Sequence, residues 1–160
     1  MEVISKSPEE TRKLGERLGN LLRAGDAVAL EGELGAGKTC FIQGMARGLG
    51  VEEKYVVSPS FVLIREYEGR IPLYHVDLYR LHPGAEVAGL GLDEYLEGGG
   101  ATAIEWAEKA AGQLPDGCIR IEMKSLGETS RAIIVQGLDE ERMDIMMPRK
   151  KLPASRGKES

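Results

Sequence analysis

Residues 32–39 read Gly-Glu-Leu-Gly-Ala-Gly-Lys-Thr and have the form G-x-x-x-x-G-K-[ST] of a phosphate-binding loop. In such a loop, glycines let the backbone curl until successive N–H groups point inward at an anion. Lys38 brings a positive charge to the outer phosphates, and the Thr39 hydroxyl can complete the coordination of Mg²⁺. The helix that begins here adds the partial positive charge of its N-terminus. The motif therefore predicts a site for the phosphates of a nucleotide.

The residues on either side of the loop favour the same interpretation. Residues 27–30 form a short apolar run, which is typical of a buried strand. Apolar residues then recur at helical spacing, at Phe41, Ile42, Met45, Ala46 and Leu49. A strand, a glycine-rich loop and a helix in this order distinguish a nucleotide site from a glycine-rich turn.

Length and composition indicate one globular domain. The chain has 160 residues, of which 42% are hydrophobic and 29% charged. No apolar run approaches the length of a membrane span, and the first residues lack the apolar core of a secretory signal. Of the two cysteines, Cys40 falls in the helix after the loop, so a disulfide is not expected. We therefore expect a cytoplasmic protein.

Charge divides the chain into an acidic body and a basic tail. Residues 148–160 hold five basic residues and one acidic residue, a net charge of +4. Since the whole chain has a net charge of −5, the first 147 residues have a net charge of −9. An acidic surface argues against a body that wraps nucleic acid. The tail, with its two prolines and few apolar residues, is typical of disorder, and it either touches RNA or stays solvated. We expect one domain over residues 1–147 and a basic, disordered tail over 148–160.

The remaining pattern predicts an α/β fold. Ser7 and Pro8 begin a helix that Gly25 ends. Further expected elements are strands over residues 55–67, 70–76 and 101–104, helices over 86–96 and 106–114, and paired strands over 118–124 and 131–135. Together they indicate a three-layer P-loop NTPase-like fold. A mixed, mostly parallel sheet is flanked by helices and carries a C-terminal antiparallel hairpin.

Two acidic residues directly follow apolar runs that are expected to form strands, and both are candidates for chemistry on a phosphate. Asp77 follows residues 73–76, and Glu105 follows residues 103–104. Phosphoryl transfer requires carboxylates that handle Mg²⁺ and the attacking water, and these gather at the carboxyl ends of parallel strands. Asp77 resembles the acid of a Walker B strand, and Glu105 could order a water or hold Mg²⁺ through one. The alternative is that each acid caps the next element. His75 and Trp106 are interpreted as structural.

A serine pair around Pro59 interrupts a β-rich stretch. The hydroxyls of Ser58 and Ser60 could sense the γ-phosphate through Mg²⁺, as switch segments do. The segment could equally be a bulge or strand edge that Pro59 imposes. The residues alone leave both interpretations open.

Four segments, in this order, resemble the bacterial TsaE family, formerly YjeE. They are residues 32–40, Ser-Pro-Ser-Phe at 58–61, His-Val-Asp-Leu-Tyr-Arg-Leu at 75–81 and Glu-Trp-Ala-Glu at 105–108. The resemblance spans about residues 7–135. It implies a small P-loop ATPase that uses ATP and Mg²⁺ and serves the machinery installing N6-threonylcarbamoyl on adenosine 37 of certain tRNAs. It also implies a TsaD–TsaB complex as partner, in which TsaD performs the transfer and ATP hydrolysis resets the complex, with tRNA reached indirectly through that complex.

The resemblance carries roles to single residues. Lys38, Asp77 and Glu105 become the catalytic residues, and Thr39, Asp77 and Glu105 the ligands of Mg²⁺. The nucleotide-binding set adds Gly32, Gly35, Ala36, Gly37, Cys40 and Ser60 to Lys38 and Thr39, with Pro8 and Glu128 flanking the adenine. Ser60 and Cys40 stand where the family usually has threonine.

Two other functions stay open at this level. A small-molecule kinase would bring an arginine-bearing lid and an acceptor pocket, and no segment has that form. A nucleotide-sensing adaptor without turnover would not need Asp77 and Glu105. A GTPase is disfavoured, because the single asparagine, Asn20, leaves no N-K-x-D motif for guanine.

Deletion of residues 148–160 should leave the fold intact, because a polar tail buries little surface. We expect the melting temperature of the shortened chain, followed by circular dichroism, to match that of the full chain. A large fall in melting temperature would show that the tail packs on the body.

Overall fold

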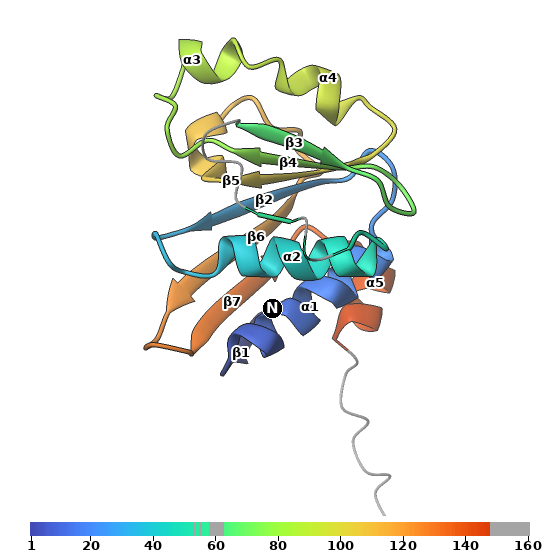
Figure 1. Cartoon of the computed structure of the whole chain (residues 1–160), viewed down its shortest axis with the longest axis vertical. Coiled ribbons are helices and arrows are strands. Elements are labelled where there is room, and N and C mark those ends of the chain that lie inside the picture. The colour runs from blue at the N-terminus through green and yellow to red at the C-terminus, as the bar shows by residue number, and fades with distance from the viewer. Residues whose placement is uncertain (53, 55, 58–62, 148–160) are drawn as a thin grey trace, which may run out of the picture.

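The structure is a computed structural model, and its described residues are 1–52, 54, 56–57 and 63–147. These residues form a seven-stranded sheet in the order β1-β7-β6-β2-β5-β4-β3 (Figure 1). The strands are β1 (Glu2–Ser5), β2 (Ala27–Gly32), β3 (Ile64–Tyr67), β4 (Leu73–Asp77), β5 (Ala101–Glu105), β6 (Ile119–Ser125) and β7 (Arg131–Gln136). The four central strands β6, β2, β5 and β4 run parallel, and the outer pairs are antiparallel. The expected mixed sheet and its terminal hairpin are confirmed.

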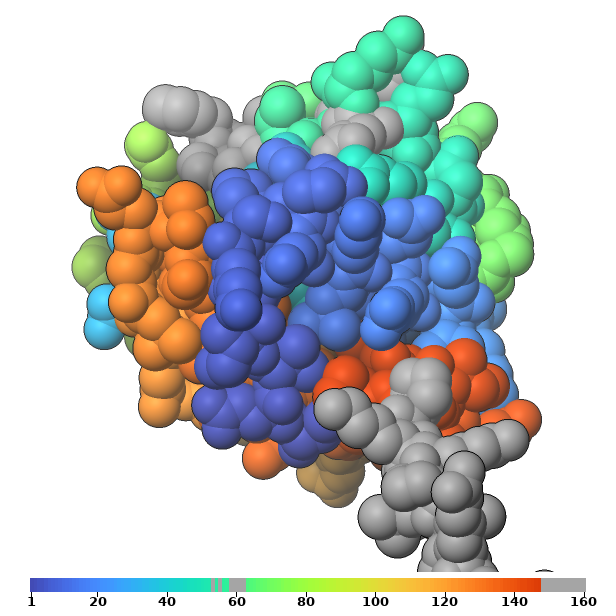
Figure 2. Space-filling model, turned by 90° about the horizontal axis from the view of Figure 1, so that it is seen from below, coloured from blue at the N-terminus to red at the C-terminus, as the bar shows by residue number. Residues whose placement is uncertain are grey.

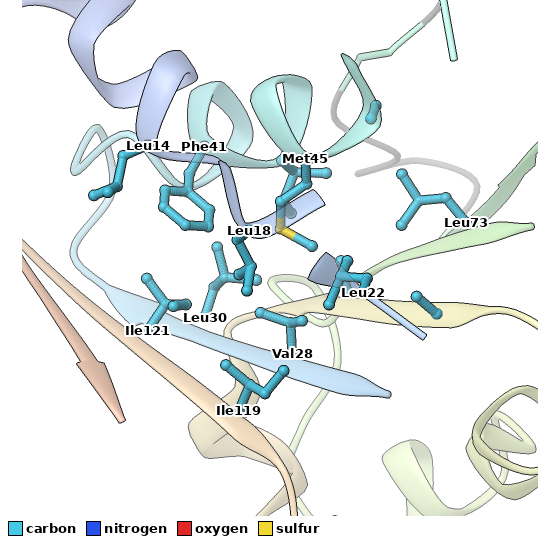
Figure 3. Close-up of a cluster of buried hydrophobic side chains, with 14 of the residues drawn as sticks. Leu14, Leu18, Leu22, Val28, Leu30, Phe41, Met45, Leu73, Ile119 and Ile121 are labelled. Atoms are coloured by element: carbon cyan, nitrogen blue, oxygen red, sulfur yellow. The ribbon is translucent and has the colours of Figure 1, made fainter. Parts of the chain in front are cut away.

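Helices cover both faces of the sheet. The elements are α1 (Pro8–Leu21), α2 (Lys38–Gly48), α3 (Ala85–Ala88), α4 (Leu92–Leu96), the 3₁₀ helix η2 (Ala107–Ala110) and α5 (Glu140–Met146). Alternate residues of β2 serve the two faces, because side chains of a strand point to opposite sides. Val28 and Leu30 pack with α1 and α2 (Figure 3), whereas Ala27 and Ala29 pack with the short helices. None of the helices described is long and apolar enough to cross a membrane.

Helix α1 starts as its sequence predicts. The hydroxyl of Ser7 accepts a hydrogen bond from the Glu10 amide at 3.1 Å, and the Glu10 carboxylate accepts one from the Lys6 amide at 2.7 Å. The predicted cap at Ser7 is present, with Pro8 in the first turn, but Glu10 accepts from the amide before the N-cap residue and not from that of Ser7, so the pair is a variant of the capping box. The helix ends at Leu21, four residues before the predicted stop at Gly25.

Two predicted helices are wrong in length. Residues 86–96 form the separate helices α3 and α4, because Gly91 adopts a left-handed conformation with φ 77°. Residues 106–114 contain only the short η2, because left-handed Trp106, with φ 59°, stands before it and Ala111, with ψ 130°, ends it after Ala110. Of the expected strand over 55–67, residues 64–67 form β3, and residues 55 and 58–62 lie outside the described part. The strand expected from residue 70 begins at Leu73.

Two elements were not predicted, β1 and α5. Strand β1 pairs antiparallel with β7 and extends the sheet at its edge. Helix α5 begins after Asp139, whose side chain accepts from the Arg142 amide at 2.8 Å. The Arg142 guanidinium reaches Asp26 at 2.6 Å and the Leu21 carbonyl at 3.4 Å, so it ties α5 to the end of α1. Figure 2 shows the N-terminal segments (blue) between the hairpin (orange) and α5 (red).

Helices α1 and α2 touch backbone to backbone through glycines. A Cβ atom added to Gly15 would lie 2.2 Å from the Phe41 carbonyl oxygen, and one added to Gly44 would lie 2.0 Å from the Arg12 carbonyl oxygen. Gly19 and Gly48 make equally close approaches one turn further on. No side chain therefore fits at these four positions, and this close contact sets the position of α2 behind the glycine-rich loop.

Substitution Gly44→Ala should destabilise the fold, because its methyl group would overlap the Arg12 backbone, which has no flexible end to move. Overpacking of this kind typically costs about 3 kcal/mol or somewhat less. In a chain of this size that corresponds to a melting temperature roughly 6–12 °C lower. Thermal unfolding by circular dichroism measures the change.

Gly117→Ala provides the control, because an added Cβ there meets nothing within 4 Å and the residue does not have a positive φ. It should unfold within a few degrees of the native chain. A Gly44→Ala protein as stable as this control would contradict the backbone contact between α1 and α2.

Candidate functional site

The glycine-rich loop leaves the carboxyl end of β2 and enters α2, as its sequence predicts. Gly37, the residue before α2, is left-handed with φ 100°. A Cβ added to it would lie 3.2 Å from the Met123 side chain, and one added to Gly32 would lie 2.6 Å from the Met123 carbonyl oxygen. Both positions therefore favour glycine, and the loop lies close against β6.

Lys38 is buried in the mouth of this loop. Its ammonium group donates to the carbonyl of Gly32 and, at 3.0 Å, to the carbonyl of Glu33. It also lies 4.1 Å from the centre of the Trp106 ring, within the range of a cation–π contact. Burial lowers the pKa of Lys38, and the nearby carboxylates, Glu105 first among them, oppose that shift.

The two predicted carboxylates meet beside the loop. Strands β4 and β5 run parallel with Asp77 opposite Glu105, so both side chains leave neighbouring strand ends. Each residue is 3% exposed. The Thr39 hydroxyl donates to Glu105 Oε1 at 2.9 Å, and the Tyr79 amide donates to Asp77 Oδ1 at 2.9 Å. The structure thus brings together four of the residues that the sequence singled out, from three separate segments.

These residues line one cavity of about 340 Å³. Its full lining is Leu34, Gly35, Gly37, Lys38, Thr39, Asp77, Tyr79, Glu105 and Trp106. Among the residues described, no cluster of three or more His, Cys, Asp or Glu side chains could hold a metal alone. Mg²⁺ is usually held by one or two carboxylates together with substrate phosphates and waters. A hydroxyl, two carboxylates and a lysine in one cavity therefore fit a Mg²⁺–nucleotide.

Trp106 forms a wall of this cavity, a position that its sequence did not reveal. Its ring lies 5.1 Å from that of Tyr79, centre to centre, and it also packs against the core under the short helices. Lys109 donates to the carbonyls of Tyr79 and Leu81 and so holds this segment in place. Trp106 thus has the structural role that the sequence predicts, since it packs against the core. The same side chain also contacts Lys38 in the cavity.

A second, smaller hollow of about 100 Å³ adjoins the loop on the side of α1 and the hairpin. It is lined by Pro8, Thr11, Gly37, Cys40, Thr129 and Arg131. The Cys40 thiol donates to the Pro8 carbonyl at 3.3 Å. Glu128 is exposed on the neighbouring hairpin turn and does not line the hollow. The residues predicted to flank an adenine, Pro8 and Glu128, thus lie at this side of the loop, and their role stays a prediction.

Arg131 is a residue of the site region that the sequence did not indicate. Its guanidinium donates to the Gly35 carbonyl at 3.1 Å and to the Gly127 carbonyl at 2.8 Å, so it links the loop to the hairpin turn. No local pattern marks this arginine, because the contact depends on the order of strands β7, β6 and β2. The predicted switch residue Ser60 lies outside the described residues.

Comparisons with known proteins agree with these features. A sequence model of the family described as "Threonylcarbamoyl adenosine biosynthesis protein TsaE" matches residues 5–133. The TsaE protein of Treponema pallidum is 41% identical over 84% of this chain and 99% of its own length. That of Bacillus subtilis is 44% identical over 79% of each chain.

A solved structure extends the likeness to the fold. The crystal structure of Bacillus subtilis YdiB superposes with a TM-score of 0.76 and is 36% identical. The alignment covers 91% of this chain and 90% of that one. The glycine-rich loop, the paired strand-end acids and these matches lead to one conclusion: the chain belongs to the TsaE family of threonylcarbamoyladenosine biosynthesis proteins.

Proposed function

We propose that this protein is a Mg²⁺-dependent ATPase that serves the tRNA N6-threonylcarbamoyladenosine machinery. The observation that carries the proposal is the convergence of Lys38, Thr39, Asp77 and Glu105 on one cavity. The family and the names of the relatives supply the pathway. The cavity supplies the chemistry.

Each of the four side chains has a task that its position supports. Lys38 exchanges the carbonyls of Gly32 and Glu33 for phosphate oxygens, and Thr39 and Asp77 hold the cation. Bound Mg²⁺ neutralises the phosphates and the charge that develops during transfer. Glu105, buried at the end of β5, orders the attacking water or holds the cation through a water. The Trp106 ring packs against the Lys38 ammonium and favours its charged form through a cation–π contact.

The smaller hollow suits the base of the nucleotide. It adjoins Gly37, and it places Pro8 on one side and the hairpin turn near Glu128 on the other. Cys40, at the second position after the lysine, also lines the hollow, and its sulfur contacts the Pro8 carbonyl. We assign the adenine to this hollow and the phosphates to the larger cavity.

Turnover by the isolated chain should be slow. No arginine lines the larger cavity among the residues described, so the described part of the chain supplies no arginine finger to the transferring phosphate. Leu34 is 76% exposed and Tyr79 is 45% exposed at the rim of the same cavity, which leaves apolar surface for a partner. We propose a TsaD–TsaB-like complex in the cytoplasm as that partner, with tRNA reached only through it.

The proposal is tested by ATP turnover of the purified chain with and without its TsaD–TsaB-like partner. An arginine finger supplied in trans accelerates hydrolysis by 10³-fold or more in other P-loop proteins, so a rise of at least about tenfold is expected. Equal rates with and without the partner would count against the proposal. ADP release that instead depends on a small hydroxylated acceptor would indicate a kinase.

Substitution Glu105→Ala should lower kcat about 100-fold or more, because it removes a group assigned to the reacting water. The dissociation constant for Mg²⁺–ATP, measured by calorimetry, should change less than about threefold, since the loop and Lys38 remain. The exposed Glu66 on β3 provides a matched control, and Glu66→Ala should behave as the native chain. Loss of nucleotide binding in Glu105→Ala would mean that Glu105 is a ground-state ligand of the metal.

A further inference from the structure

The geometry points to His75 as the residue that positions Glu105. This inference rests on the ATPase function proposed above and adds a residue outside the cavity to its machinery. His75 does not line the cavity, so its action on the reaction passes through the Glu105 carboxylate.

His75 is fully buried on β4, two residues before Asp77. Alternate residues of a strand share a face, and His75 lies opposite Ala103, two residues before Glu105, in the parallel ladder. The imidazole therefore stands beside Glu105 on the face that carries the loop and α2. His75 Nε2 lies 2.7 Å from Glu105 Oε2.

Glu105 is held through both of its oxygens. Oε1 accepts from the Thr39 hydroxyl at 2.9 Å, and Oε2 faces His75. A carboxylate with one bond can turn about its terminal torsion, which is broad in side chains of this kind. A second bond on the other oxygen fixes the carboxylate plane. His75 thus sets the direction in which Glu105 presents its lone pairs to the cavity.

The donor of this hydrogen bond follows from the tautomer of His75 when Glu105 is a carboxylate. A carboxylate only accepts, so the proton lies on His75 Nε2. Among the described residues, Nδ1 of His75 has no hydrogen-bond partner. A proton on Nδ1 would leave a buried donor unpaired and would also remove the bond to Glu105. The arrangement therefore favours the Nε2–H tautomer.

A histidine with a purely structural role would also be buried and would also make one hydrogen bond to a buried polar atom. The two roles differ in what a substitution changes. A structural histidine affects the free energy of unfolding, whereas a positioning histidine affects kcat at unchanged affinity for ATP. Outer residues that orient a reacting or metal-bound group are typically worth about 10–100-fold in activity or affinity.

Two amide substitutions separate these roles. The amide nitrogen of His75→Gln falls near the position of Nε2 and can still donate to Glu105. That of His75→Asn falls near Nδ1 and cannot reach it. We expect His75→Gln to retain a third or more of the native kcat with partner present, and His75→Asn to lose about 10–100-fold. Both should bind Mg²⁺–ATP within about threefold of the native chain by calorimetry, at a temperature where circular dichroism shows both to be folded.

A double substitution tests whether the effect passes through Glu105. In a Glu105→Gln background, His75→Asn should lower kcat by less than about twofold, because the group that it positions is already gone. Equal kcat values for His75→Gln and His75→Asn, or a full additional loss in the Glu105→Gln background, would overturn the assignment.

The tautomer is measured without any turnover. Long-range ¹H–¹⁵N spectra of the native chain, with His82 and His75 separated by a His82→Gln variant, should show His75 as the Nε2–H form. An Nδ1–H form would overturn the inference. If the native chain fails to hydrolyse ATP with its partner while the Nε2–H form is found, the proposed ATPase function fails and the contact survives as a structural one.

Discussion

The parallel pairing of β2, β5 and β4 is the constraint on which the whole site depends. Because these strands run in one direction, their carboxyl ends share one edge of the sheet. The loop leaves β2 at that edge, and Glu105 and Asp77 leave β5 and β4 beside it. In-register pairing of Asp77 with Glu105 then places two carboxylates next to Thr39 and Lys38. An antiparallel partner in place of β5 would carry its last residue to the opposite edge.

Contacts outside the site hold the loop in its shape. Helix α2 is pressed against α1 through glycines whose added Cβ atoms would enter the neighbouring backbone. This helix–helix contact therefore fixes the position of α2, the helix that begins with Lys38 and Thr39. On its other side the loop lies against Met123 of β6, and Arg131 bonds to the Gly35 carbonyl. Preorganisation of this kind reduces the cost of ordering the loop when a phosphate binds.

The parts of the fold that local pattern determines were predicted, and the parts that tertiary contacts determine were not. The strand and helix around the loop, the cap at Ser7 and the terminal hairpin follow from short patterns of apolar and turn residues. The helix expected over 106–114 is wrong because Trp106 is left-handed and Ala111 leaves the helical conformation. The left-handed conformation is strained for a tryptophan, and the Trp106 ring packs against Tyr79. Helix α5 and its cap at Asp139 were not predicted although the cap is a local feature, and the contact of Arg131 with Gly35 depends on the strand order.

The electrostatics of the site explain why its charged residues tolerate burial. Lys38, Asp77 and Glu105 are each nearly inaccessible, and an isolated buried charge is costly. Burial lowers the pKa of Lys38, whereas Glu105, Glu108 and Asp77 favour its charged form. The ammonium rests on two carbonyl groups, and Glu105 accepts from Thr39 and faces His75. Carbonyl dipoles are weaker partners for a lysine than phosphate oxygens, so an anion that replaces them gains a charge-assisted bond. The same burial that disfavours the charged form of Lys38 thus strengthens its attraction for an anionic ligand.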